Sequence, residues 1–380
     1  MVLPDAWIEM WGVDPCPWLR SSPEEPARWI ALHGLPPCRA DDAALDAARR
    51  AAVASDIVQD LVSRLPRWDD EPGASGHDSP GYLPNLLHLL ADLGVRAGDL
   101  EAVDDAVDAL ETHQFDDGRL ASFGRVPGRS QPIWHALPCD THSITEVLLR
   151  YGRGERPAVR RAMDRIEADL QATNQGRAWT CVPDPQVRWR GPGRKHDVCP
   201  QVTLEALRLF SRMDACDRPD GLELAAAAML DVWRHRGDEH PYSFGHGIRF
   251  KTVKWPPLWY GIYWMLDTLG RYPELWGSER PEDRRAVAEL VACLVSYNVS
   301  PDGTVTPRSV YRGFNGFSFG QKKTPSPVAT ALLAVVAHRF ADLSADVTDV
   351  EVERLASSKG GTGTPRPPRP GPDRDADPPP

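Results

Sequence analysis

The sequence lacks several features that would assign it to a familiar protein class. Its first residues have neither the basic start nor the apolar run of a signal peptide, and no uncharged apolar run of about 18 residues occurs anywhere. We therefore expect a cytoplasmic protein without a transmembrane segment. The GxGxxG, P-loop, HExxH and GxSxG motifs are also missing, so dinucleotide, nucleotide-triphosphate, zinc-protease and α/β-hydrolase chemistry have no support.

The sequence also lacks an excess of positive charge and a cysteine pattern typical of a disulfide framework. Lys and Arg number 44 against 54 Asp and Glu, and the net charge of −10 predicts no general attraction to nucleic acid or anionic membranes. Seven cysteines, an odd number without framework spacing, fit thiols better than disulfides in a cytoplasmic protein. Hydrophobic residues make up 41% of the 380 residues, which is enough for a sizeable core.

What the sequence does contain is a recurring apolar segment. Successive copies end 60, 58, 59, 59 and 68 residues apart, at Gly34, Gly94, Gly152, Ser211, Gly270 and His338. A period near 59 sustained over this length indicates a helical repeat protein. We expect the copies to be the inner helices of the repeats, at 27–35, 84–94, 144–152, 204–212, 261–270 and 328–338.

A second, more amphipathic segment lies between successive copies. In one of them Leu100, Val103, Val107 and Leu110 fall at helical spacing, which predicts a helix with one buried face. We expect such outer helices at 41–65, 100–113, 158–173, 221–234 and 281–297. With no convincing strand, this pattern predicts an all-α fold of about six helical hairpins, in which an α/α toroid of inner and outer rings is favoured over an open solenoid.

The repeats indicate one domain, which we place at residues 1–356. From residue 357 the chain has almost no apolar side chains and is rich in proline. Such a segment cannot form a packed core. We therefore predict a disordered tail at 357–380.

The turns after the outer segments carry a spaced motif. Leu110, Gln114 and Gly118 keep an aliphatic-x3-Gln-x3-Gly spacing, which resembles the QW repeat of the α/α-toroid superfamily of terpenoid cyclases and protein prenyltransferase β subunits. The resemblance covers roughly residues 25 to 340. It implies an enzyme, prenyltransferase-like or terpene-cyclase-like, that acts on an isoprenoid or its diphosphate in a central aromatic cavity. The alternative is a toroid that has lost catalysis and binds a lipid, peptide or protein partner.

The start of two inner segments carries acidic and imidazole groups. The proton-initiated cyclases of this superfamily hold an Asp-rich acid motif at such a start, and this chain has Asp140 and His142 there. His196 and Asp197 occupy the same place one repeat later. Because a histidine beside a carboxylate titrates near neutral pH, these four residues are the candidate catalytic residues for proton transfer. Helix capping is the alternative interpretation.

The same stretch is similar to the zinc site of the protein prenyltransferases. Those enzymes bind zinc through an Asp, a Cys and a later His, with basic residues for the diphosphate just before the Asp-x-Cys. Asp197 and Cys199 match the pair, and Arg190 and Arg194 precede it, so the resemblance implies zinc as the cofactor. The third ligand is not identified. An Asp that caps a helix beside a buried Cys is the alternative.

Aromatic and basic residues gather before the last two inner segments. Trp255, Trp259 and Tyr263 could line a pocket whose π faces stabilise a carbocation or hold a prenyl chain, with plain core packing as the alternative. Basic side chains at the same end of the ring would bind an anion, unless they form a scattered surface: Arg190, Arg194, Lys254, Arg312, Lys322 and Lys323. A carbohydrate-active ring would need two facing carboxylates, for which Asp140 and Asp197 are the candidates.

Overall fold

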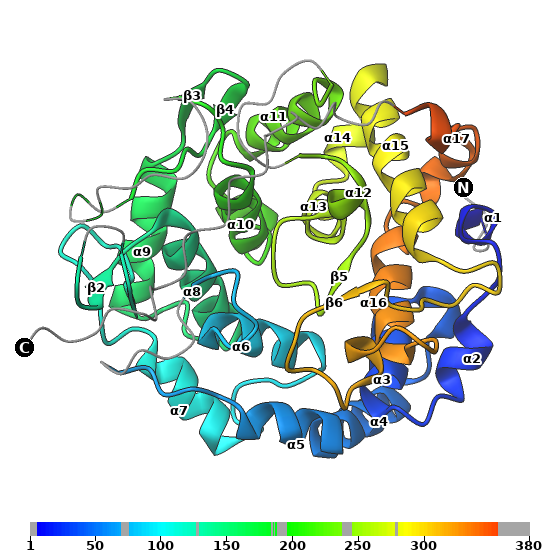
Figure 1. Cartoon of the computed structure of the whole chain (residues 1–380), viewed down its shortest axis with the longest axis horizontal. Helices are drawn as coiled ribbons and strands as arrows, with labels where there is room; N and C mark the ends of the chain where they lie inside the picture. Colours follow the sequence, from blue (N-terminus) through cyan, green and yellow to red (C-terminus); the bar gives the residue numbers. More distant parts are fainter. Residues whose placement is uncertain are drawn as a thin grey trace, which may run out of the picture.

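Six apolar helices form the inner wall of a closed ring (Figure 1). They are α3 (Glu25–Gly34), α6 (Leu83–Asp92), α8 (Pro138–Arg150), α10 (Pro200–Phe210), α13 (Ile262–Leu269) and α16 (Pro327–His338). All but α13 have proline in the first turn, where the missing N–H costs no hydrogen bond and the fixed φ favours the helix. All six predicted inner segments are therefore helices.

The computed structural model describes residues 6–69, 76–126, 129–183, 185, 187, 196–237, 245–277 and 280–355. The predicted tail at 357–380 lies outside the described residues. The domain boundary at residue 356 and the disorder of the tail therefore stay predictions.

An outer ring of helices covers the inner wall (Figure 1). Its helices are α4 (Asp42–Ala54), α5 (Asp56–Ser63), α7 (Glu101–Ala109), α9 (Pro157–Ala168), α11 (Leu222–Arg234) and α15 (Pro281–Asn298). The segment predicted as one helix at 41–65 is two, because Ser55 has an extended backbone and its side chain accepts a hydrogen bond from the amide of Val58 at the start of α5. Beside α16 the outer position is filled by α1 (Ala6–Trp11), which packs on α17 (Ser344–Thr348). The prediction of an all-α, α/α-toroid fold is confirmed.

Closure of the ring joins the first inner helix to the last. α16 packs on α3 at least as extensively as any other two inner helices pack together, and a Cβ atom at Gly34 would lie 2.5 Å from Cγ2 of Val335. Only glycine permits this approach. Nε1 of Trp11 also donates to the carbonyl oxygen of Gly303 at 3.0 Å. Segments from the two ends of the described chain therefore share one core.

Short elements fill the connections. The remaining helices are α2 (Cys16–Arg20), α12 (Ile248–Lys251) and α14 (Glu274–Gly277). The antiparallel pairs are β1 (Ser122–Gly124) with β2 (Ile133–His135) and β3 (Gln171–Thr173) with β4 (Gly176–Ala178). β5 (Lys254–Trp255) pairs in parallel with β6 (Ser309–Val310). This last pair ties the loop before α13 to the loop before α16.

The N-terminal segment contains a disulfide that the sequence analysis did not predict. Cys16 is bonded to Cys38, and their Cα atoms lie 5.4 Å apart. Because α2 packs against α3 and the turn that holds Cys38, the fold brings the two residues to bonding distance. The prediction of thiols is therefore wrong for this pair. The other cysteines lie outside disulfides: Cys139, Cys181, Cys199, Cys216 and Cys293.

Within the described residues, no single helix has both the length and the apolar character to cross a membrane, although the bent pair of helices Pro327–His338 and Ala341–Thr348 passes on length and composition.

A buried ion cluster lies within the inner wall. The carboxylate of Glu146 on α8 is fully buried, and its Oε1 accepts hydrogen bonds from Nε of Arg208 at 2.9 Å and Nη2 of Arg212 at 3.0 Å. The guanidinium of Arg208 also lies 4.0 Å from the ring centroid of Trp264. Burial alone would raise the pKa of Glu146, but the charges of Arg208, His88 and Arg212 outweigh it and hold the pKa far below its ordinary value.

We expect Glu146→Gln to lower the free energy of unfolding at pH 7 by about 3 to 5 kcal/mol, because two buried or half-buried arginines lose their carboxylate. Urea unfolding followed by circular dichroism measures the change. The contribution of Glu146 is present above the ordinary glutamate pKa of about 4.3 and is lost as the pH falls below it, since the folded-state pKa is lowered. The difference between the two proteins should therefore shrink in acid.

The matched control is Glu167→Gln, at an exposed position of α9, which should change the free energy of unfolding by no more than about 0.5 kcal/mol. Equal stability of Glu146→Gln and the unchanged protein at pH 7 would contradict the role of the cluster.

Candidate functional site

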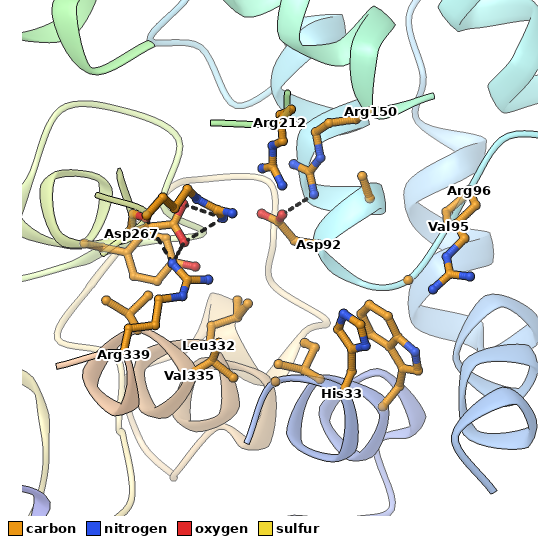
Figure 2. Close-up of a pocket in the computed structure, with 18 of the residues that line it drawn as sticks. His33, Asp92, Val95, Arg96, Arg150, Arg212, Asp267, Leu332, Val335 and Arg339 are labelled. Carbon is orange, nitrogen blue, oxygen red and sulfur yellow. Dashed lines mark hydrogen bonds and ion pairs between the residues drawn. The ribbon is translucent and has the colours of Figure 1, made fainter. Parts of the chain in front are cut away.

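The ring interior has two ends, which we name by the helix ends that surround them. At the C-terminal mouth, a cavity of about 470 Å³ is lined by Asp92, Arg150 and Arg339 among others (Figure 2). At the N-terminal mouth, a cavity of about 290 Å³ lies beside the start of α13 and includes Trp259. Tyr263 lines both cavities. The two mouths therefore hold separate cavities that share Tyr263 of α13 in their linings.

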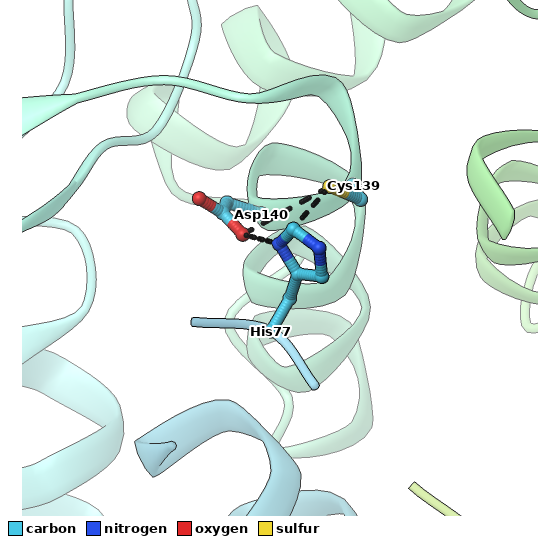
Figure 3. A group of neighbouring side chains, drawn as sticks. All are labelled: His77, Cys139 and Asp140. Carbon is cyan, nitrogen blue, oxygen red and sulfur yellow. Dashed lines mark hydrogen bonds and ion pairs between the residues drawn. The ribbon is translucent and has the colours of Figure 1, made fainter. Parts of the chain in front are cut away.

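Asp140 and His77 form a close pair at the N-terminal mouth (Figure 3). Asp140 lies in the first turn of α8 and is 3% exposed. Its Oδ1 is 3.0 Å from Nδ1 of His77, and Sγ of Cys139 is 3.4 Å from the same nitrogen. The fold thus brings together groups that lie 63 residues apart in the sequence.

The loop before α6 holds His77 in place. Nδ2 of Asn85, in the first turn of α6, donates to the carbonyl oxygens of His77 and Ser79, at 2.9 Å each. The imidazole also stacks on the indole of Trp259, with ring centroids 4.6 Å apart and planes inclined by 19°. These contacts fix both the position and the orientation of the imidazole, so that Nδ1 faces Asp140.

Burial and Asp140 shift the pKa values of the groups around this pair. Burial lowers the pKa of His77, but the hydrogen bond and charge of Asp140 outweigh it, so the pKa of His77 is raised. Burial, with the charge of Asp140 added to it, raises the pKa of the Tyr82 phenol and of the Cys139 thiol well above their ordinary values. Both groups are therefore neutral, whereas Asp140 sits at a helix N-terminus, where a negative charge is favoured.

Glu205 on α10 is a second carboxyl group of the interior. It is 2% exposed, and its Oε1 accepts a 2.5 Å hydrogen bond from Nε2 of Gln201. Burial raises the pKa of Glu205 well above its ordinary value; the hydrogen bond from Gln201 opposes this, and the charge of Asp140 adds to it. A buried carboxyl group whose pKa is raised beside a second carboxyl group is typical of sites for acid–base chemistry.

Thiol groups extend the site and allow a metal to be considered. Cys199 is hydrogen-bonded to Cys181, which together with burial raises the pKa of Cys199, and Cys181 also interacts with His77 and Cys139. The ligand atoms of His77, Cys139 and Asp140 lie within 4.8 Å of one another. Neighbouring ligands of a tetrahedral zinc ion are about 3.3 to 3.8 Å apart. The three groups therefore fit zinc with small shifts, with Cys181 or Cys199 as a further donor.

Aromatic rings flank the pair. Those that line the cavity at the N-terminal mouth are Trp259, Tyr260, Tyr263 and Tyr311. Lys254 brings a cation to its edge, since Nζ lies 3.7 Å from the ring centroid of Tyr311. Trp255 is 1% exposed and packs on Tyr263, with centroids 6.3 Å apart. Of the predicted aromatic residues, Trp259 and Tyr263 line the cavity, and Trp255 supports Tyr263 from behind.

No protein-family model and no curated protein matches the chain. The chain is similar to a type II terpene cyclase. The solved apo structure of this enzyme, MstE from Scytonema, is 15% identical, with a TM-score of 0.38, over 90% of this chain and 98% of that one. A variant of MstE in complex with geranylgeranyl dihydroxybenzoate, described as its substrate, is 17% identical, with a TM-score of 0.39, over 90% and 97%.

His142, a predicted catalytic residue, is a core residue in the structure. Its Nδ1 lies 3.0 Å from the carbonyl oxygen of Val202, and its ring meets Trp179 edge-on with centroids 6.4 Å apart. Burial lowers the pKa of His142 to about 4, although the hydrogen bond to Val202 opposes this. The imidazole is thus neutral at pH 7. The partner of Asp140 in the structure is His77.

The predicted residues of the next repeat have other contacts. Asp197 is buried and accepts a 2.9 Å hydrogen bond from Nδ2 of Asn174. Cys199 contacts Cys181. His196 is exposed, with a left-handed φ of 74°. A joint metal site of Asp197 and Cys199, and proton transfer by His196 and Asp197, stay predictions.

The predicted anion-binding residues lie on loops. Those within the described residues are exposed: Lys254, Arg312, Lys322 and Lys323. Arg190 and Arg194 lie outside the described residues. The binding of an anion by this set stays a prediction.

Two groups of interior residues were missed by the sequence analysis. His77 lies in a loop without a recognisable motif, so no local signal marks it. The second group is a set of arginines at the C-terminal mouth, each at the end of an inner helix or just after it: Arg150, Arg212, Arg271 and Arg339. Successive members lie 62, 59 and 68 residues apart. Their recurrence follows the repeat period and could have been used to find them.

We expect the imidazole of His77 to titrate above the ordinary histidine pKa of about 6.5, because Asp140 stabilises its charged form. NMR of histidine-labelled protein should show such an imidazole whose signal is absent in His77→Gln, and another, His142, that titrates near 4. In Asp140→Asn the pKa of His77 should fall, because burial lowers it and only the weaker effects of Asp78 and Cys181 then oppose burial.

The control is Asp164→Asn, at an exposed position of α9, which should leave both titrations unchanged. A pKa of His77 that does not respond to Asp140→Asn would show that the pair does not exist in solution.

Proposed function

We propose that this protein is an enzyme that acts on an isoprenoid inside the ring, and that Asp140 starts the reaction by proton transfer. The observation that carries the proposal is the Asp140–His77 pair, with the imidazole stacked on Trp259 at the N-terminal mouth. The sequence resemblance to the toroid superfamily supports the same substrate class. The substrate of the comparison enzyme has a geranylgeranyl group.

The pair is suited to protonate a carbon–carbon double bond. In the reacting form the proton shared by the pair lies on Asp140. It would pass to the alkene, so that the O–H bond breaks, a C–H bond forms and a carbocation remains. Nδ1 of His77 lies 3.0 Å from Oδ1 of the carboxylate left behind, and a hydrogen bond donated by this nitrogen stabilises the carboxylate, which makes the acid stronger. Loss of a proton from a carbon next to the final cation returns the proton. The reaction is then an isomerisation that needs no co-substrate.

The aromatic cavity is suited to the cation. Trp259, Tyr260 and Tyr263 line it, and the indole of Trp259 stacks on His77. The π faces of such rings attract a cation by about 0.5 to 2 kcal/mol each, most strongly where water is excluded. They offer no lone pair comparable to that of water, so the carbocation is protected from early quenching. An apolar polyene chain also packs favourably on these surfaces.

We expect Asp140→Asn to lower the turnover number at least about 100-fold, because an amide cannot donate an acidic proton. The assay is product analysis by gas chromatography and mass spectrometry after incubation with farnesyl diphosphate, geranylgeranyl diphosphate and a geranylgeranyl compound without a diphosphate. Trp259→Leu should keep substrate binding but lower turnover. Asp164→Asn is the control and should react at the original rate.

Formation of a cyclised product at an unchanged rate by Asp140→Asn would exclude Asp140 as the acid. If no substrate of the panel reacts but the protein binds one of them equally well with and without Asp140→Asn, the alternative of a toroid that only binds a hydrophobic ligand is favoured.

A second candidate is a zinc-dependent prenyltransferase, and the ligand geometry of His77, Cys139 and Asp140 favours it. These three residues would hold the ion, with Cys181 or Cys199 as a fourth donor. Zinc would supply a Lewis acid that activates a thiol or water. In that case Cys139 would give up its proton to bind the metal, although its pKa is raised by burial.

Metal content separates the two candidates. For the proton-transfer mechanism we expect turnover to persist in excess EDTA. Plasma mass spectrometry measures the zinc content. One equivalent of zinc per chain that is lost in Cys139→Ala would establish the zinc-dependent candidate instead, provided that Cys216→Ala, at an exposed position, keeps its zinc.

A further inference from the structure

The cavity at the C-terminal mouth is not used by the proposed proton transfer. It has a volume of about 470 Å³ and draws its lining from five of the six inner helices and from the residues that follow them. One wall is apolar and includes Trp29, Leu332 and Val335. Seven of the other lining residues are arginine or aspartate. Tyr263 also lines the cavity beside Trp259.

Positive charge dominates this lining. The arginines outnumber the carboxylates by five to two, an excess of three positive charges: Arg96, Arg150, Arg212, Arg271 and Arg339 against Asp92 and Asp267. His33 adds no charge near pH 7, because burial and the charges of Arg96 and Arg39 lower its pKa. Figure 2 shows the guanidinium groups of Arg150, Arg212 and Arg339 turned toward the same space.

The nearby carboxylates leave hydrogen-bond donors of these arginines available. Oδ1 of Asp267 accepts from Arg271 at 3.1 Å and from Arg339 at 2.7 Å, so two arginines share one carboxylate. Asp92 accepts from Arg150 at 2.5 Å. Each guanidinium has five N–H donors, and Nε of Arg271 is buried with no hydrogen-bond partner in the described part of the chain. A ligand with several acceptor atoms could use these donors.

Mutual repulsion of the arginines is evident at Arg212. Burial and the charge of Arg150 lower the pKa of Arg212 to about 9; Glu146 opposes this, and Arg271 and Arg208 add to it. The partial negative charge of about one half at each helix C-terminus attracts arginines to this end. That field fades beyond the last turn of a helix, so it does not account for guanidinium groups turned into a shared cavity. An anion in the cavity would relieve the repulsion.

We propose that the cavity at the C-terminal mouth binds a small molecule that carries a diphosphate group. The several oxygens of a diphosphate accept paired hydrogen bonds from more than one guanidinium. A single carboxylate has too few oxygens to pair with five arginines in this way. The volume leaves room for an organic part against Trp29, Leu332 and Val335. This site lies at the opposite end of the ring from Asp140 and does not depend on the proposed reaction.

Isothermal titration calorimetry with inorganic diphosphate, at fixed low ionic strength and without divalent metals, tests the proposal on the full chain. We expect saturable binding that is tighter than that of inorganic phosphate. Arg271→Gln and Arg96→Gln should each raise the dissociation constant about 10-fold, the usual scale for a lost hydrogen bond to a charged group. Arg285→Gln, an exposed arginine of α15, should leave it unchanged.

The two variants protect the test against a folding failure. Asp267 keeps its bond to Arg339 in Arg271→Gln, and Arg96 is exposed, so Arg96→Gln should fold in any case. The proposal is wrong if diphosphate shows no saturable binding, or if neither variant weakens the binding. It is also wrong if only Arg312→Gln weakens the binding, because the anion would then lie on the loops at the other end. Asp140→Asn should bind diphosphate normally, so failure here is distinguishable from failure of the proton-transfer mechanism.

Discussion

The packing of α3 against α16 is the constraint on which the rest of the structure depends. Inner helices that are apolar nearly all round must be covered on every side, and an open array would expose one such face at each end. Closure removes both exposed faces at once. It requires the backbone of α3 at Gly34 to lie close against the side chain of Val335 on α16.

A closed ring of parallel inner helices has two ends of opposite electrostatic character. Helix N-termini favour negative charge and C-termini favour positive charge. Asp140 occupies the first end, and Arg150 and Arg339 follow or end helices at the other. Between them, Glu146 and Arg208 carry opposite charges across the wall and need each other to be buried. The fold thus places acid–base groups and guanidinium groups at different ends without any separate domain.

The sequence analysis predicted the ring, but of the Asp140–His77 pair at the N-terminal mouth it predicted only Asp140. Helix positions depend on local signals, such as the spacing of Leu100, Val103 and Val107 or the glycines at the helix ends, and these are visible in one chain. Asp140 was predicted because it starts an inner helix. Its partner could not be, because His77 lies in the neighbouring repeat, in a loop that hydrogen bonds from Asn85 hold in place. The bond between Cys16 and Cys38 was missed for the same reason: only tertiary packing brings them together.

The contact between α3 and α16 joins segments that are roughly 300 residues apart. During synthesis at about 5 to 20 residues per second, the first inner helix must therefore wait on the order of 15 to 60 s for its final neighbour. Its apolar face is exposed at the ribosome for that time, which makes the nascent chain a natural client for a chaperone. A ring of this kind cannot mature hairpin by hairpin; its last step comes only after the end of α16 has left the ribosomal tunnel.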